Sequence, residues 1–327
     1  MSTTLEHLQA LSANDTSQKE ISFFYKKCLK IAVITISKRY YNERMVYSGT
    51  GLTYENIAAD ALAPLFVKSK SEEPIGLIKS YNQWEKPIIE ESHAEFFVHK
   101  VVWNRVAQFM TRVLKESDPF FEKIHSSLKY FAQKNDYNKI VYFGITFITE
   151  PGIEIISGKV IDSVQFESFP NSLFVKKFDM VLQEVMDYIK LETDCFPAIP
   201  LNMLVKKIKG IQNKSFVNSS TLSQAYHFEE EMDIDKIVED SLQKVYSYLE
   251  RAKLKNPNID NEVEIALKSA LKDISEDIKN DGVGWGLFDY LKVYLKDLEK
   301  DDFYKNFHSI MNYLNNQLKS HIAEQIK

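Results

Sequence analysis

Cysteine, glycine and proline are all scarce in this 327-residue chain, and each shortage excludes a class of protein. The two cysteines, Cys28 and Cys195, are too few for a disulfide framework or a cysteine metal site, and they fit a reducing compartment. With only 10 glycines and 9 prolines, a turn-rich all-β fold is disfavoured and helices are favoured. No apolar run reaches the length of a membrane span, and the polar N-terminus lacks the apolar region of a signal peptide. We therefore expect a cytoplasmic protein.

Patterns that mark enzymes and cofactor sites are also missing. The chain contains no GxSxG, HExxH or CxxC motif, and its seven histidines are scattered. His93 and His99 do not have the i, i+4 spacing that a zinc-binding helix needs. The glycines of Gly282–Gly286 lack the spacing of a phosphate loop, and the acid run Glu229–Asp235 suits the start of a helix. We expect no catalytic residues, no metal and no cofactor, and hence no enzyme.

Charge is distributed unevenly along the chain. Acids outnumber bases 46 to 41 overall, but residues 1–150 carry 19 Lys and Arg against 17 Asp and Glu. Residues 151–327 carry 22 against 29, so the net charges of the two parts are +2 and −7. Neither part has the strong positive charge that would mark nucleic-acid binding by itself. Any such binding must therefore be local.

Apolar residues recur every three or four positions over most of the chain, which predicts amphipathic helices. One helix has Thr53 as its N-cap and Pro64 near its end, where it should bend or stop. Another should begin at Asp118, a capping residue, with Pro119 in its first turn. The expected helices span 18–41, 54–66, 76–84, 94–116, 119–133, 172–191, 201–211, 234–249, 263–278, 287–298 and 303–326.

Residues 138–169 differ from the rest of the chain in composition, because β-branched and aromatic residues dominate there. The runs KIVYFGITFI and IEIISGKVIDSVQF predict two or three strands, with Pro151–Gly152 as the turn between them. The expected fold class is mainly α, with two or three helical domains and a small antiparallel hairpin or wing around 138–169. The expected domains are a flexible tail at 1–17, a helical domain at 18–135, an α+β unit of winged-helix-like type at 136–213, a linker at 214–228 and an acidic helical domain at 229–327.

The segment Phe96–Lys115 holds twenty residues without one Asp or Glu, inside an acidic protein. On a helical wheel it has one apolar stripe and one polar face, and such a face suits phosphates and base edges. Trp103 lies at the flank of the stripe, where it is either a core residue or a stacking contact for unpaired bases. An ordinary amphipathic helix whose cations pair with acids elsewhere is the structural alternative. The polar face and its border contain Lys100, Asn104, Arg105, Gln108, Thr111, Arg112 and Lys115.

The succession Phe24–Arg39, Tyr54–Phe66 and Phe97–Arg112 resembles the promoter-recognising region of bacterial RNA polymerase sigma factors of the extracytoplasmic-function type. In that family, a first helix is followed by a helix that grips the polymerase and by a basic aromatic helix that reads melted promoter DNA. The resemblance covers residues 21–116 and implies a DNA-binding protein of transcription initiation, with RNA polymerase core and promoter DNA as partners. The implied polymerase contacts are Ile57, Asp60, Leu62 and Phe66, and the implied DNA contacts are Lys100, Trp103, Asn104, Arg105, Gln108, Arg112 and Lys115.

The sequence departs from that family at several places, including the long loop at Tyr41–Thr53 and the hairpin-bearing segment 138–169, which stands where the family has a linker. Pro64 interrupts the helix that would grip the polymerase, and the nearest candidate for a second DNA-binding helix is the short basic segment Leu201–Ile211. The acidic C-terminal helices would then form a module that contacts a regulatory protein. The alternative function is a helical adaptor that binds proteins and no nucleic acid. Exposure of Trp103 and Asn104 on a basic groove would favour the first function, and full burial of both would favour the second.

Overall fold

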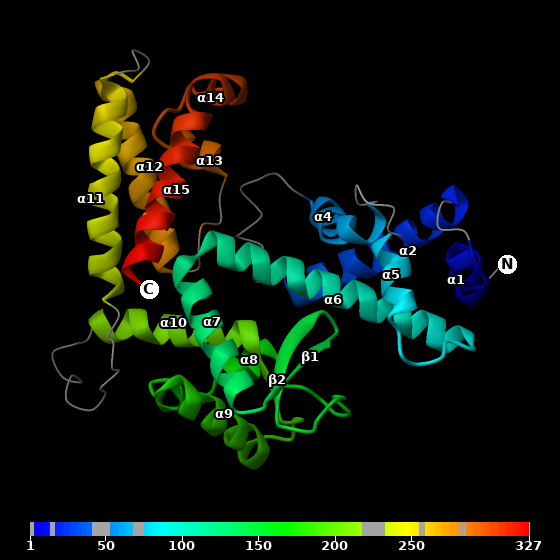
Figure 1. The fold of residues 1–327 in the computed structure, drawn as a ribbon. Coiled ribbons are helices and arrows are strands. Elements are labelled where there is room, and N and C mark those ends of the chain that lie inside the picture. The colour runs from blue at the N-terminus through cyan, green and yellow to red at the C-terminus, as the bar shows by residue number, and fades with distance from the viewer. Residues whose placement is uncertain are drawn as a thin grey trace. The chain divides into compact units, whose positions relative to one another are not determined.

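The computed structural model describes residues 3–13, 17–40, 53–67, 75–217, 233–254, 259–280, 283 and 286–326. Over these residues the protein is mainly helical with a small three-stranded antiparallel sheet, so the predicted fold class is confirmed (Figure 1). The chain divides into two compact units. Of the described residues, unit 1 contains those within 3–40, 53–112 and 140–147, and unit 2 contains those within 113–139 and 148–326. The domain boundaries expected from the sequence stay a prediction.

Unit 1 is a group of helices around one apolar core. Helix α2 packs against α1 and α4, and α5 contacts both α1 and α4. Phe24, Leu62, Phe97 and Val102 are fully buried, because each lies on the apolar face of its helix. The helices are α1 (Thr4–Ala13), α2 (Gln18–Arg39), α4 (Tyr54–Phe66), α5 (Gly76–Asn82) and the larger part of α6 (Glu91–Ser117), which ends in unit 2.

Residues 4–13 form α1, so the predicted flexible tail is wrong for this segment. Leu8 and Leu11 are fully buried, which anchors the helix by its apolar side. The backbone N–H groups of Thr4 and Leu5 donate to the Glu91 carboxylate at 2.8 and 2.9 Å. An anion at a helix N-terminus satisfies donors that have no partner within the helix. Two leucines in a polar stretch gave too weak a periodicity to predict these contacts.

Helix α4 has the predicted bounds, and its first cap is confirmed. The Thr53 hydroxyl accepts a hydrogen bond from the backbone N–H of Asn56 at 3.3 Å. Pro64 lies in the last turn, and the helix ends two residues later at Phe66, as the lost hydrogen bond to Asp60 predicts. The next helix begins close by, because a Cβ atom at Gly76 would meet the carbonyl oxygen of Pro64 at 2.2 Å. Only glycine permits that approach.

The sheet contains β1 (Asn138–Tyr142), β2 (Ile145–Thr149) and β3 (Ala198–Pro200), in the order β1-β2-β3. The predicted turn at Pro151–Gly152 is present, with Gly152 at φ +80°, but it does not connect two strands, because KIVYFGITFI forms both strands of the hairpin by itself. Phe143 and Gly144 make the turn, with φ of +46° and +80°. Positive φ at both central residues is the geometry that matches the twist of a two-residue hairpin. The second run, 153–166, forms no strand and leads into a short helix, α8 (Ser163–Glu167).

The part of unit 2 from α7 to α10 packs around one hydrophobic cluster. Its core includes Phe121, Phe166, Met186 and Leu204, all at most 2% exposed. The predicted N-cap of α7 is confirmed, since Asp118 accepts from the N–H of Phe121 at 3.1 Å and Pro119 follows it. The elements are α7 (Pro119–Lys134), α8, a 3-10 turn (Asn171–Leu173), α9 (Phe178–Glu192), β3 and α10 (Leu201–Val217). Helix α10 is longer than the predicted 201–211 and includes part of the predicted linker.

The C-terminal helices surround a second hydrophobic cluster in the same unit. Helices α11, α12 and α15 pack side by side (Figure 1). The predicted helix at 303–326 is two helices, because the chain breaks at Phe307, and the predicted 287–298 helix ends early at Lys292. None of the described helices is long and apolar enough to cross a membrane. The bounds are α11 (Ile234–Lys253), α12 (Asn261–Lys279), α13 (Leu287–Lys292), α14 (Lys300–Asn306) and α15 (His308–Gln325).

Candidate nucleic-acid interface

Helix α6 is packed along the apolar stripe that the sequence predicts. Val98, Val102, Val106 and Met110 are fully buried. The stripe is broader than predicted, since neighbouring apolar side chains also contribute to the core. Because this side of α6 is enclosed by the protein, any partner must approach from its remaining surface. The additional buried residues are Ala94, Phe97, Val101, Ala107 and Leu114.

The tip of the β1–β2 hairpin is fixed to the helices of unit 1 by several contacts. The Tyr40 hydroxyl donates to the carbonyl oxygen of Gly144 at 2.6 Å, and the Lys100 ammonium donates to the carbonyl oxygen of Val141 at 2.5 Å. A Cβ atom at Gly144 would lie 2.4 Å from the Cγ2 atom of Thr35, so position 144 requires glycine for space as well as for φ. Burial lowers the pKa of Lys100, because the charged ammonium is partly removed from water.

Aromatic rings gather at this tip and remain partly exposed. The Phe143 ring lies 4.6 Å from the Trp103 ring and 4.4 Å from the Tyr142 ring. The Arg39 guanidinium lies over the Phe143 ring, 5.6 Å from its centre. Phe143 is 39% exposed in spite of these contacts. We name Arg39, Lys100, Trp103, Tyr142 and Phe143 the hairpin-tip cluster.

The conformation of Phe143 is unusual for a bulky residue. Non-glycine residues rarely adopt positive φ, and the left-handed region costs an L-residue roughly 1–2 kcal/mol. Glycine, asparagine or aspartate would fit the first position of this turn better. Rare backbone conformations of this kind concentrate at functional sites, where surrounding contacts hold them. The strain at Phe143 therefore marks the hairpin tip as a place to look for function.

The three segments that build the hairpin-tip cluster contain no acidic residue. Residues 21–40 of α2, 96–115 of α6 and 137–149 of the hairpin all lack Asp and Glu. The cations of these three segments have no acidic neighbour within their own segment, and cations next to exposed rings suit a ligand with phosphates and unpaired bases. The nearest paired acid on α6 is Glu95, which forms an ion pair with Lys27 of α2.

The structure separates the residues predicted to contact DNA. Trp103 and Asn104 are both partly exposed, so the structure shows neither the full exposure that would favour DNA binding nor the full burial that would favour an adaptor. Arg105 follows Trp103 by two positions, so it projects about 200° around the helix, away from the hairpin. Its guanidinium donates to the side chain of Gln108 at 3.2 Å, and the guanidinium of Arg112 lies over the ring of Phe109. Lys115 belongs to unit 2.

The residues predicted to contact a polymerase are divided between core and surface. Ile57 is 2% exposed and Leu62 is fully buried, because both lie on the face of α4 that packs inside unit 1. Asp60 is exposed, and Phe66 is partly exposed beside the ring of Tyr25 at 5.5 Å. Polymerase binding by α4 stays a prediction. In this conformation such a contact would use Asp60 and Phe66 rather than the two buried residues.

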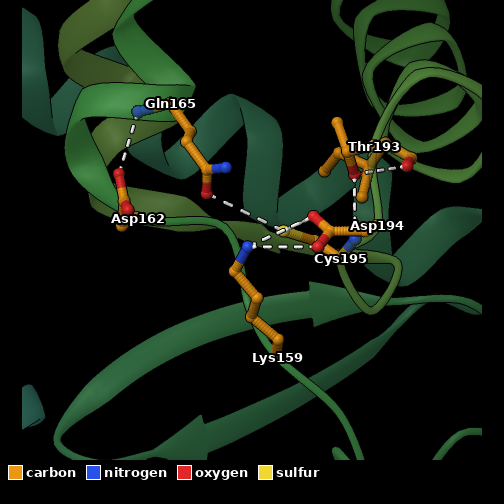
Figure 2. A network of polar contacts seen from close by, with 7 residues as sticks. Lys159, Asp162, Gln165, Thr193, Asp194 and Cys195 are labelled. Carbon is orange, nitrogen blue, oxygen red and sulfur yellow. Dashed lines mark hydrogen bonds and ion pairs between the residues drawn. The ribbon is translucent and has the colours of Figure 1, made fainter.

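A second polar network surrounds the buried thiol of Cys195 in unit 2. Figure 2 shows Lys159 reaching Asp194, and the Gln165 side chain pointing toward Cys195. The Lys159 ammonium lies 3.2 and 3.3 Å from the two oxygens of Asp194, while the Cys195 sulfur lies 3.7 Å from one of them. These contacts hold the loop before β3.

The other thiol, that of Cys28, is unsuited to react. Burial raises its pKa to about 12, and the nearby Lys27 offsets only part of this effect. Among the described residues, no cluster of three or more His, Cys, Asp or Glu side chains is placed to hold a metal ion. The hairpin-tip cluster is therefore the best-supported candidate site. Arg39, Tyr142 and Phe143 were missed because the hairpin turn inside KIVYFGITFI was not predicted, although Phe-Gly between two β-branched runs is itself a hairpin signal.

Comparison of the chain with protein-family models, with curated proteins and with solved structures finds no match.

Proposed function

We propose that this protein binds single-stranded DNA through the hairpin-tip cluster and the adjoining surface of α6. The observation that carries the proposal is the convergence of three acid-free segments on a group of partly exposed rings. Rings that present a face to solvent can stack on unpaired bases, at roughly 1–3 kcal/mol for each base. Arg39 and Lys100 would attract the phosphates that connect those bases. A duplex hides its base faces, so we expect a preference for single strands.

The resemblance to sigma factors supplies the biological setting of this proposal. In that setting the bound strand is promoter DNA that RNA polymerase has opened, and the protein acts in transcription initiation. A sigma-like protein also docks on the polymerase core, and Asp60, which is exposed on α4, would contribute to that contact together with the partly exposed Phe66. Copurification of bacterial RNA polymerase core with the full chain, and its loss in an Asp60→Lys variant, would support this second step. No retention of the core by the wild-type chain would refute it.

DNA binding is tested by fluorescence anisotropy with a labelled single-stranded oligonucleotide at about 50 mM salt. We expect saturable binding that weakens steeply as salt rises, because bound phosphates release counterions. An Arg39→Glu variant should bind more weakly, since it places a carboxylate beside the ring of Phe143. Lys19→Glu is the matched control, because Lys19 is an exposed cation in the first turn of the same helix.

Three outcomes separate the alternatives. Binding that Arg39→Glu weakens and Lys19→Glu leaves intact supports the proposed surface. Equal loss in both variants would show a non-specific attraction to net charge and would refute the surface. No binding at low salt would refute DNA binding altogether and would favour the alternative function, a helical adaptor that contacts proteins only.

A further inference from the structure

A group of cations in unit 2 is not used by the proposed function. Lys115 lies near the end of α6, Lys129 lies on α7, and Lys139 lies in β1. The Lys115 ammonium is 3.5 Å from the hydroxyl of Ser126, which places the end of α6 against the middle of α7. His125 is the neighbour of Ser126, and the charges of all three lysines act on its ring. The five residues therefore form one cluster, although they come from three elements.

The positive charge of this cluster is poorly compensated. None of the three lysines forms an ion pair with any residue that the structure describes, and Glu122 is the one acid that acts on Lys115. Burial lowers the pKa values of Lys115 and Lys139, and repulsion from Lys129 adds to the effect on both. Like charges at a protein surface repel one another more strongly than charges in open water. An anion bound between them would remove that cost.

His125 adds a polar group that lacks a partner. Its side chain is 6% exposed, and its Nδ1 atom is buried with no hydrogen-bond partner among the described residues. The ring stacks on Phe121, with 5.9 Å between the ring centres. Burial, together with Lys115, Lys139 and Lys129, lowers the pKa of His125 to about 3, so the imidazole is neutral at physiological pH. Buried polar atoms without partners are rare and call for an explanation such as a bound ligand.

We propose that Lys115, Ser126, Lys129 and Lys139, together with His125, form a binding site for a phosphate group. A phosphate dianion would neutralise most of the local excess of positive charge, and its oxygens accept hydrogen bonds from ammonium and hydroxyl groups at the same time. The same oxygens would favour a protonated His125, because an adjacent anion stabilises the imidazolium. The ligand is either a small phosphate compound or one phosphate of a nucleic-acid backbone, since both present the same chemistry to the site.

The site can be tested by NMR on the full-length protein labelled with nitrogen-15 at histidine. Sodium phosphate is added at constant ionic strength, with sodium chloride as the compensating salt, and the His125 ring signals are assigned with a His125→Gln variant. We expect the signals to shift and saturate, and the His125 pKa to rise from about 3. Chloride alone should produce neither change. Identical behaviour in phosphate and chloride would overturn the proposal.

Variants then locate the site. Lys129→Gln and Lys139→Gln each remove one exposed ammonium, so the fold should persist and the affinity for phosphate should fall about tenfold. Lys134→Gln is the matched control, because Lys134 is exposed in the last turn of the same helix, α7, and should leave the affinity unchanged. An unchanged response in both Lys129→Gln and Lys139→Gln would refute the location of the site.

A short single-stranded oligonucleotide serves as the second ligand. If it shifts the His125 signals, the site accepts backbone phosphate, and if only inorganic phosphate does so, the site is specific for a small phosphate compound. Either result supports the site, and no response to both ligands would refute it. The Arg39→Glu variant keeps this test separate from the proposed DNA surface, because it lies in unit 1 and should leave the phosphate response of His125 intact.

Discussion

Replacing Phe143 tests both the strain at the hairpin tip and its role in binding. Two substitutions are needed, because asparagine tolerates positive φ better than alanine does, while both remove the ring. Loss of the ring removes its contacts with the rings of Trp103 and Tyr142 and its cation–π contact with the Arg39 guanidinium. Aromatic pairs contribute about 0.5–1.5 kcal/mol each, and an exposed cation–π contact contributes about 0.5–1 kcal/mol. Phe143→Ala should therefore lower the free energy of unfolding by roughly 2 kcal/mol or more.

Phe143→Asn should be about 1 kcal/mol more stable than Phe143→Ala, because it relieves most of the backbone strain at φ +46°. Urea denaturation of the two variants measures this difference directly. Both variants should bind single-stranded DNA about 5- to 150-fold more weakly than the wild type, if one base stacks on the ring. Equal stability of the two variants would refute the strain argument. Wild-type affinity in both would refute stacking on Phe143, whatever their stabilities.

Four further substitutions test other contacts. Gly144→Ala should lower the free energy of unfolding by about 2–4 kcal/mol, because φ is positive at this position and the new Cβ atom would overlap with Thr35. Thr35→Ser removes the Cγ2 atom, so in a double-mutant cycle it should recover part of the lost stability. Lys209→Met should cost about 3–5 kcal/mol in urea denaturation, because it leaves the buried Asp118 carboxylate without the ammonium 2.5 Å away. The pKa of His125 is about 3 in the folded protein and about 6.5 in the unfolded chain, so the unfolded chain binds the proton at a higher pH. The free energy of unfolding of the wild type should therefore fall as the pH is lowered from about 6.5 to 3. His125→Gln should flatten that dependence by up to about 1.4 kcal/mol per pH unit, measured by unfolding at several pH values.

Local sequence signals predicted the helices well where a cap or a long periodic face was present. Thr53 and Asp118 begin their helices as expected, because capping depends on residues within one turn. Helix α1 was missed, since its stability comes from contacts with Glu91 and with the core rather than from its own sequence. Tertiary contacts of this kind are not visible in a window of neighbouring residues.

The candidate site was predictable in part. The absence of acids in Phe96–Lys115 and the intermediate position of Trp103 could be read from the sequence. That the hairpin lies against α6, and that Lys100 bonds to it, could not, because the two segments are about forty residues apart. The helical wheel also grouped Arg105 with Lys100, whereas the hairpin selects one side of the helix and leaves Arg105 on the other.

The first turn of α7 connects two cores through neighbouring residues. Phe120 belongs to the hydrophobic cluster of the C-terminal helices, and Phe121 belongs to the cluster around α9 and α10. Beside them, the buried ammonium of Lys209 binds both Asp118 and the carbonyl oxygen of Ile278, 2.5 and 2.6 Å away. Because Phe120 and Phe121 are consecutive residues, neither hydrophobic cluster can unfold without disturbing the backbone that the other cluster holds in place. Unit 2 should therefore melt in a single cooperative transition, and a fragment cut after α10 would expose Phe120 and remove the Ile278 carbonyl from Lys209.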